Sequence, residues 1–189
     1  MSTVRVTVVN GSYNTNSTTG RLADAIVQAL LEQCAPHEVA LEVTTVTLIE
    51  LAADMFARLT SDWSAQSTSH ALQGAMASVT NADLLLVASP IYKASYTGLF
   101  KVFFDLLGPN SLREKPVLVC ASGGSDEHRL ALDSEMRVLF SFFCAQVLPV
   151  GVYSRAVDFL EGGSLAPALS QSIAQAAESG HRYIARMPQ

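Results

Sequence analysis

Three short loops carry the side chains best suited to chemistry in this chain of 189 residues. Gly11–Gly20 is rich in hydroxyl and amide groups, Ser89–Gly98 combines Pro, Tyr, Ser and Gly, and Ala121–Ser125 contains a glycine pair. These groups donate and accept hydrogen bonds, but they include no nucleophile paired with a base. The pattern therefore favours the binding of a cofactor that carries its own chemistry.

The first loop has the composition of a phosphate-binding loop. It lies between a predicted strand and a predicted helix, and a helix N-terminus adds partial positive charge, so it can bind a phosphate without Lys or Arg. It lacks both the Gly-Lys-Ser/Thr of a Walker A loop and a Gly-x-Gly-x-x-Gly run. The alternative is an ordinary polar loop in which Ser17 or Thr18 caps the helix. The length of the hydroxyl-rich run favours phosphate.

The second loop follows an apolar segment and is typical of a site for a flat, polar-edged aromatic ligand. Pro90 fixes its own φ and has no N–H. We therefore expect the N–H groups of Ile91, Tyr92 and Lys93 to point into the crevice, where the edge of a flavin ring needs hydrogen-bond partners. Tyr92 and Tyr96 are expected to pack on or beside the ring. Alternatively, the tyrosines are half-buried surface aromatics and Lys93 is a solvated charge.

The third loop contains consecutive glycines, which allow a ligand to approach the backbone closely. The N–H groups of Gly123 and Gly124 are suited to stabilising negative charge on a ring. The alternative is a tight turn that needs positive φ. His128 follows the loop, and a single histidine of this kind is more often a capped or surface residue than a catalyst.

Other functional classes find little support. There is no His/Cys/Asp/Glu cluster with metal-ligand spacing and no Gly-x-Ser-x-Gly elbow, so we predict no metal site and no side chain acting as a catalytic acid, base or nucleophile. Cys34, Cys120 and Cys144 are widely spaced, which predicts reduced and mostly buried thiols.

Composition limits the partners and the location. The chain is 49% hydrophobic and 15% charged with a net charge of −5, so a folded domain is expected and no basic run favours nucleic acid. No apolar stretch is long enough to cross a bilayer, and the N-terminus lacks the features of a signal peptide. We therefore expect a cytoplasmic protein that binds neither nucleic acid nor membrane.

The elements expected to position the loops alternate between strand and helix. Ile49–Trp63 is ambiguous: its pattern is compatible with a short helix followed by a loop, and Trp63 is expected in packing or an interface. The predicted strands are Val4–Val9, Leu41–Leu48, Leu84–Ala88, Pro116–Ala121 and Gln146–Tyr153. The predicted helices are Arg21–Cys34, Ser67–Val79, Leu99–Leu107, Leu130–Phe143 and Leu165–Arg186.

This alternation predicts an α/β fold with a mostly parallel sheet covered on both faces. We expect a single flavodoxin-like domain over residues 1–189, with five parallel strands in the order 2-1-3-4-5 and helices on both faces. The three loops then lie at the carboxyl ends of strands, where open α/β sheets bind ligands.

These motifs resemble the NAD(P)H-dependent FMN reductases of the flavodoxin-like superfamily, especially those that supply reduced FMN to monooxygenases. The resemblance extends from Val4 to about Val152, while the segment after Tyr153 matches poorly. The motifs that carry it are Gly11-Ser12…Ser17-Thr18-Thr19, the run from Ser89 to Lys101, and Ser122-Gly123-Gly124-Ser125…His128.

The resemblance implies FMN and NAD(P)H as cofactors and hydride transfer from nicotinamide to flavin. It also implies a homodimer or homotetramer and a flavin-dependent monooxygenase as partner. Many family members have a basic residue in the first loop, near the position of Thr15 here. By resemblance, Ser12, Asn14, Ser17, Thr18 and Thr19 hold the FMN phosphate; Pro90, Ile91, Tyr92 and Lys93 line the ring and ribityl chain; and Ser122, Gly123, Gly124 and Ser125 face the pyrimidine side.

Two other functions remain open at this point. One is a quinone, azo or chromate reductase that retains its FMN. The other is a flavodoxin-type electron carrier, which the mild charge and the scarcity of aromatic residues in the first and third loops disfavour. The sequence leaves the choice between NADH and NADPH open.

Overall fold

Segments rich in Val and Leu form one parallel sheet at the centre of the computed structural model, which describes residues 3–61 and 69–186. The strands are β1 (Thr3–Asn10), β2 (Ala40–Thr47), β3 (Leu84–Pro90), β4 (Pro116–Ser122), β5 (Gln146–Val147) and β6 (Val152–Ser154). Their order is β2-β1-β3-β4-β5, with β6 also paired to β4. Every residue of β3 and β4 is buried, as expected for central strands of a sheet covered on both faces.

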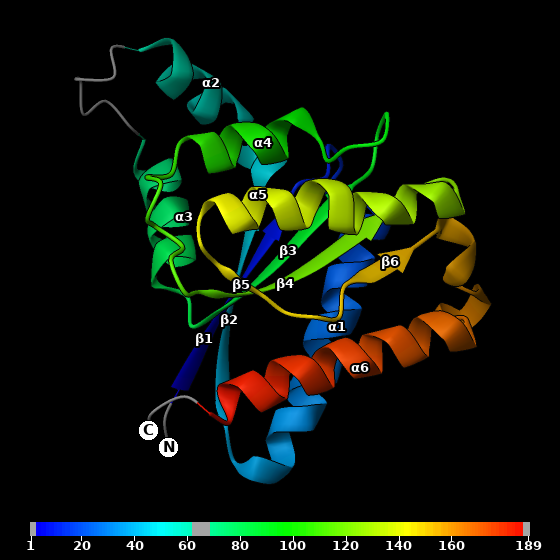
Figure 1. Ribbon diagram of the computed structural model, residues 1–189. Coiled ribbons are helices and arrows are strands. Elements are labelled where there is room, and N and C mark those ends of the chain that lie inside the picture. The colour runs from blue at the N-terminus through cyan, green and yellow to red at the C-terminus, as the bar shows by residue number, and fades with distance from the viewer. Residues whose placement is uncertain (1–2, 62–68, 187–189) are drawn as a thin grey trace.

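Helices cover the two faces of this sheet (Figure 1). On one face, α1 (Thr18–Cys34) and α6 (Pro167–Ile184) pack over a core that includes Leu22, Ile26 and Ile173. The opposite face is covered by the helices α2 (Ala52–Thr60), α3 (His70–Asn81), α4 (Gly98–Asp105) and α5 (Arg137–Phe142). The predicted flavodoxin-like order and the two helical layers are therefore confirmed.

The predicted fifth strand, Gln146–Tyr153, is wrong as a single element. Val117 pairs with Val147 and Cys120 pairs with Val152, so β4 advances three residues while its neighbour advances five. The two extra residues lie in Leu148–Gly151, where Pro149 has no N–H to donate to a strand ladder. The strand is therefore divided into β5 and β6, and β6 places Ser154 beside Ser122.

The segment between β4 and β5 also differs from the single predicted helix Leu130–Phe143. It begins with a 3₁₀ segment, Asp126–Leu130, continues as a π-helical turn, Leu132–Met136, and ends as α5. The described part of the ambiguous segment, up to residue 61, contains a 3₁₀ turn, Leu48–Leu51, followed by α2. Trp63 lies outside the described residues.

Shorter helical turns complete the chain: Ala35–His37 after α1, and Ala156–Asp158 and Glu161–Gly163 between β6 and α6. Among the described residues, no helix combines the length and the apolar character that crossing a lipid bilayer requires.

Candidate functional site

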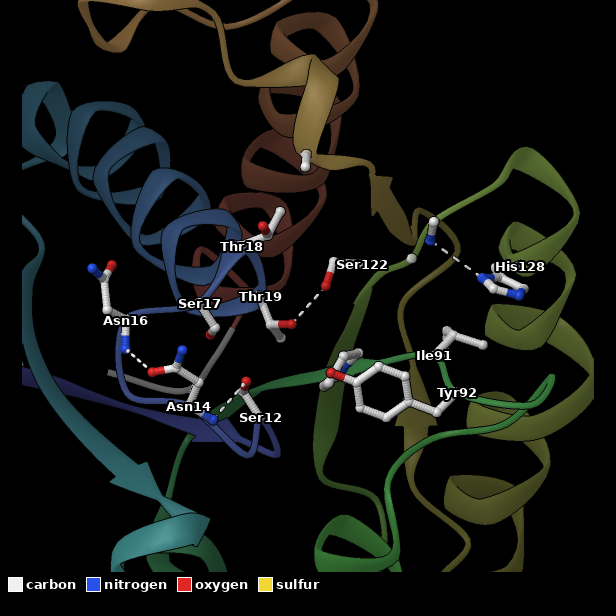
Figure 2. Close-up of a pocket in the computed structure, with 14 residues that line it drawn as sticks. Ser12, Asn14, Asn16, Ser17, Thr18, Thr19, Ile91, Tyr92, Ser122 and His128 are labelled. Atoms are coloured by element: carbon white, nitrogen blue, oxygen red, sulfur yellow. Dashed lines mark hydrogen bonds between the residues drawn. The ribbon is translucent and has the colours of Figure 1, made fainter.

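A pocket of about 550 Å³ opens where β1, β3 and β4 end. This is the size range of pockets that bind cofactors and drug-sized ligands. Figure 2 shows the first-loop side chains on one side, Ile91, Tyr92 and His128 on the other, and Ser122 between them. The lining residues are Ser12, Asn14, Asn16, Ser17, Thr18, Thr19, Pro90, Ile91, Tyr92, Ser122, Gly123, Gly124, His128 and Ala156.

The first loop is shaped by short-range side-chain hydrogen bonds. The N–H of Ser12 donates to Asn10 Oδ1, that of Asn14 to Ser12 Oγ, and that of Asn16 to Asn14 Oδ1, at 3.0–3.2 Å. Asn and Ser commonly bond the backbone two residues onward, which turns the chain tightly. The loop therefore wraps around the N-terminus of α1 and directs its polar side chains into the pocket (Figure 2).

Ser17, directly before α1, can both cap the helix and bind a ligand in the pocket. Its Oγ accepts the N–H of Gly20 at 3.0 Å, so Ser17 is the N-cap of the helix. The hydroxyl proton stays available to a ligand, because an Oγ that accepts one hydrogen bond can still donate another. The N–H groups of the first helical turn have no acceptor within the helix. Ser17 and Thr18 thus border a cluster of donors at the positive end of α1.

A buried hydroxyl pair joins the first loop to β4. Thr19 Oγ1 and Ser122 Oγ lie 2.6 Å apart, and both residues are buried. The bond connects the first turn of α1 with the end of a central strand, so it fixes the first loop relative to the sheet (Figure 2).

The second loop departs from the expectation for its backbone. The N–H of Ile91 donates to the Ser122 carbonyl at 2.7 Å, and that of Tyr92 donates to the Ser95 carbonyl at 2.9 Å. These two N–H groups are therefore unavailable to a ligand, and the prediction that they point into the crevice was wrong. The Ile91 N–H extends the pairing of β3 with β4. The Tyr92 N–H closes a tight hairpin whose tip, Lys93 and Ala94, has positive φ at both residues.

This hairpin also removes Lys93 and Tyr96 from the pocket. Lys93 lies at the exposed tip and does not line the site. Tyr96 points toward the opposite side, where its ring packs 5.4 Å from that of Phe100. Tyr92 remains a wall of the pocket, and its ring stacks on Tyr13 at 5.8 Å with an interplanar angle of 13°.

The third loop is compressed against two neighbours. A Cβ added at Gly123 would lie 2.5 Å from Tyr153 Oη and 2.8 Å from His128 Nδ1, so only glycine fits there. Its φ is not positive, so this close approach, and not a special turn, requires the glycine. Gly124 N–H donates to His128 Nδ1 at 3.3 Å. Ser125 lies outside the pocket lining, where its carbonyl accepts the Tyr153 hydroxyl.

Electrostatically, the pocket is weakly charged. None of the described residues that line it is Lys, Arg, Asp or Glu. Burial, more than the carboxylates nearby, raises the pKa of the Tyr153 phenol, which keeps that hydroxyl protonated as a donor. Across residues 3–61 and 69–186, no group of three His, Cys, Asp or Glu side chains is placed to hold a metal ion.

The pocket thus brings together all the predicted site residues except Lys93 and Ser125. Sequence reasoning missed Asn16 and Ala156, and it placed His128 beside the loop without a role. Asn16 lies within the predicted phosphate loop, so alternation along that loop was a usable signal. Ala156 had none, because its approach depends on the turn after β6.

Comparisons with known proteins agree with this geometry. The family model described as NADPH-dependent FMN reductase matches residues 4–158. An NADH-dependent FMN reductase, SfnF, of Pseudomonas putida is 40% identical over 172 residues, 91% of this chain and 88% of that protein. An FMN reductase (NADPH) of Pseudomonas aeruginosa is 40% identical over 158 residues, 84% and 80% of the two chains.

Structural similarity supports the same assignment. The X-ray structure of an oxidoreductase from Corynebacterium diphtheriae has a TM-score of 0.89 and 34% identity, and covers 98% of each chain. The chain therefore belongs to the NADPH-dependent FMN reductase family, and it is an oxidoreductase that uses FMN and NAD(P)H.

Proposed function

We propose that the protein reduces FMN with NAD(P)H and releases the reduced flavin to a separate flavin-dependent monooxygenase. The observation that carries the proposal is the pocket itself, which places a hydroxyl-rich helix N-terminus at one end and a Tyr wall facing a glycine loop at the other. A phosphate fits the first end and a flat ring fits the second.

The residues present fit FMN in their chemistry. Ser12, Asn14, Ser17, Thr18 and Thr19 would hold the phosphate, and Pro90, Ile91 and Tyr92 would face Ser122, Gly123 and Gly124 across the ring. When bound, FMN supplies the atom that accepts a hydride from nicotinamide. The protein's own part is to bind and orient the rings and to exclude water.

Release of the flavin is the finer part of the proposal. Its support is that the described residues lining the pocket include no Lys or Arg, so a phosphate dianion held there forms no ion pair with a cationic side chain. The named relatives include both an NADH-dependent and an NADPH-dependent FMN reductase, so the nicotinamide preference is left to experiment.

Steady-state oxidation of NADH and NADPH, with and without added FMN, tests the proposal. We expect oxidation that saturates with added FMN, and flavin that separates from the protein on gel filtration. Activity that ignores added FMN but requires a quinone would instead support a reductase with retained flavin. No oxidation of either nicotinamide would leave an electron carrier.

We also propose that the protein is a homo-oligomer. Leu130, Val138 and Phe142 are large apolar side chains with 61–71% of their surface exposed. Val138 and Phe142 border a groove of about 510 Å³ between α4 and α5. A ridge beside a groove on one face suits a symmetric contact with a second copy, which would cover both.

Light scattering of the purified protein tests this contact. We expect a dimer or tetramer that Phe142→Glu dissociates, whereas Phe56→Glu, at an exposed phenylalanine on α2, leaves it unchanged. A monomeric wild type would contradict the proposal.

A further inference from the structure

The third loop, Ala121–Ser125, contains one backbone amide whose hydrogen-bond partner is a side chain that lines the pocket. Gly123 N–H donates to the Ser154 carbonyl at 3.0 Å, which is a fixed main-chain bond between β4 and β6. Gly124 N–H donates to His128 Nδ1 at the longer distance of 3.3 Å, and both Gly124 and His128 line the pocket. A side chain can turn away, so the Gly124 amide is the loop amide that can pass to a ligand.

The bond also defines the state of the imidazole. Nδ1 accepts an N–H, so it carries no proton while the bond exists. A neutral imidazole therefore holds Gly124, whereas protonation turns Nδ1 into a donor and breaks the bond. Protonation of the imidazole therefore frees the Gly124 N–H for another acceptor.

We propose that His128 is a positioning residue for flavin binding, which withholds the Gly124 N–H from the ring when neutral and yields it to a ring carbonyl when protonated. The inference rests on the proposed function, because it assumes that a flavin ring faces this loop. The ring carbonyl and the neutral imidazole then compete for one donor. His128 sets flavin affinity without contacting the reacting atoms.

The close packing around the loop explains why His128 controls this amide. The position of a Cβ on Gly123 lies 2.9 Å from His128 Cβ and 2.5 Å from Tyr153 Oη, so the loop is held between the two side chains. Tyr153 donates to the Ser125 carbonyl, and His128 N–H donates to that same carbonyl at 3.3 Å. The main chain is therefore fixed on both sides of Gly124, which leaves the imidazole as the part that moves.

The segments packed around the histidine carry more carboxylates than cationic side chains. A hydrogen bond from Ser125 lowers the pKa of Glu127, with a smaller contribution from His128. Arg155 is paired with Asp126 and Asp158 at 3.2 and 3.4 Å. The titratable or charged groups on the segments packed around His128 are Asp126, Glu127, Arg129, Asp133, Glu135, Cys120, Tyr153, Arg155 and Asp158.

Two substitutions at His128 test whether the side chain withholds the Gly124 N–H from a ligand. In His128→Asn, Oδ1 occupies the place of Nδ1 on the side chain and accepts the Gly124 N–H without titrating. His128→Ala removes the acceptor and leaves the amide available at every pH. His70→Asn, at an exposed histidine at the start of α3, is the matched control.

Fluorescence titration with FMN and riboflavin, over about pH 5 to 8 where imidazole titrates, tests the proposal. We expect wild-type affinity for both flavins to rise about two- to tenfold as the pH falls, the worth of one hydrogen bond. His128→Ala should show the higher affinity and His128→Asn the lower affinity throughout, while His70→Asn follows the wild type. Riboflavin lacks the phosphate, so its parallel response excludes simple attraction of an anion.

Equal affinities in His128→Ala and His128→Asn, or a pH response that survives in either variant, would overturn the inference. A wild-type protein that binds neither flavin would overturn the proposed function, and the inference with it. Thermal unfolding of each variant without flavin shows that the fold is intact, so a folding defect is recognised separately.

Discussion

The first turn of α1 allows helix capping and ligand binding to be separated by substitution. Ser17 Oγ accepts the N–H of Gly20 at 3.0 Å, so Ser17→Ala removes the cap as well as a hydroxyl in the pocket. Thr18 also lines the pocket but does not cap the helix. The two positions therefore share an expected ligand and differ in their structural role.

The expected stability changes follow from this difference. Loss of a Ser N-cap to Ala costs about 1 kcal/mol, whereas Gly is tolerated within a few tenths. For a protein of this length, each kcal/mol lowers the melting temperature by about 2–4 °C. We therefore expect Ser17→Ala to melt a few degrees below the wild type, while Ser17→Gly and Thr18→Ala melt close to it.

The expected changes in FMN affinity depend on the hydroxyl groups in the pocket and not on the helix cap. Removing both hydroxyls, as Ser17→Gly with Thr18→Ala, should weaken FMN by roughly 1–3 kcal/mol, because each loses a hydrogen bond to a charged group. Riboflavin affinity should be unchanged, and Thr18→Ser should retain FMN affinity. Flavin fluorescence titration measures both. Unchanged FMN affinity, or an equal loss for riboflavin, would refute the assignment of these hydroxyls to the phosphate.

Three further substitutions test the surrounding structure. Gly123→Ala should destabilise the protein by about 1–3 kcal/mol, because the new Cβ would lie 2.5 Å from the Tyr153 hydroxyl oxygen. The control is Gly124→Ala, whose Cβ meets no described atom within 4 Å and should leave stability unchanged. Denaturant unfolding compares the two variants. Ser154→Ala should raise stability by about 1 kcal/mol, because its buried Oγ has no hydrogen-bond partner among the described residues; an equal loss would show that the hydroxyl is satisfied. A hydrogen bond from Arg5 lowers the pKa of Asp83. The stability that the Asp83 carboxylate contributes is therefore present above the ordinary Asp pKa of about 4 and is lost as the pH falls through the lowered value. The difference in melting temperature between wild type and Asp83→Asn should shrink in acid, and a constant difference would contradict the pairing.

The sheet and the loop positions could be predicted because they follow from local patterns. Apolar runs such as Leu84–Ala88 identified central strands, and the alternation of strands and helices predicted a parallel sheet covered on both faces. The loops then had to meet at its carboxyl edge. Composition and element order thus located the three loops that supply most of the pocket lining, and the family resemblance named the individual residues.

The direction of individual backbone donors was not accessible in this way. Pro90 suggested that the next N–H groups face the crevice, but those of Ile91 and Tyr92 are taken by carbonyls of Ser122 and Ser95. The first bond extends the pairing of β3 with β4, and the second closes a hairpin that has Lys93 and Ala94 at positive φ, a conformation that neither residue favours. No sequence signal marks such a turn, because the surrounding tertiary contacts hold it.

The corrected donors change the expected balance of flavin binding. The N–H groups of Ile91, Tyr92 and Gly123 are all engaged by main-chain carbonyls, so the ring end of the pocket has few polar groups to offer. Hydroxyls and helix amides are concentrated at the other end, around the start of α1. Most polar recognition of FMN is therefore expected at its phosphate, and the ring is expected to rest mainly on apolar and aromatic contacts. A ligand anchored chiefly at one end, by neutral groups, is more easily exchanged than one held along its length, which is what a reductase that releases its flavin requires.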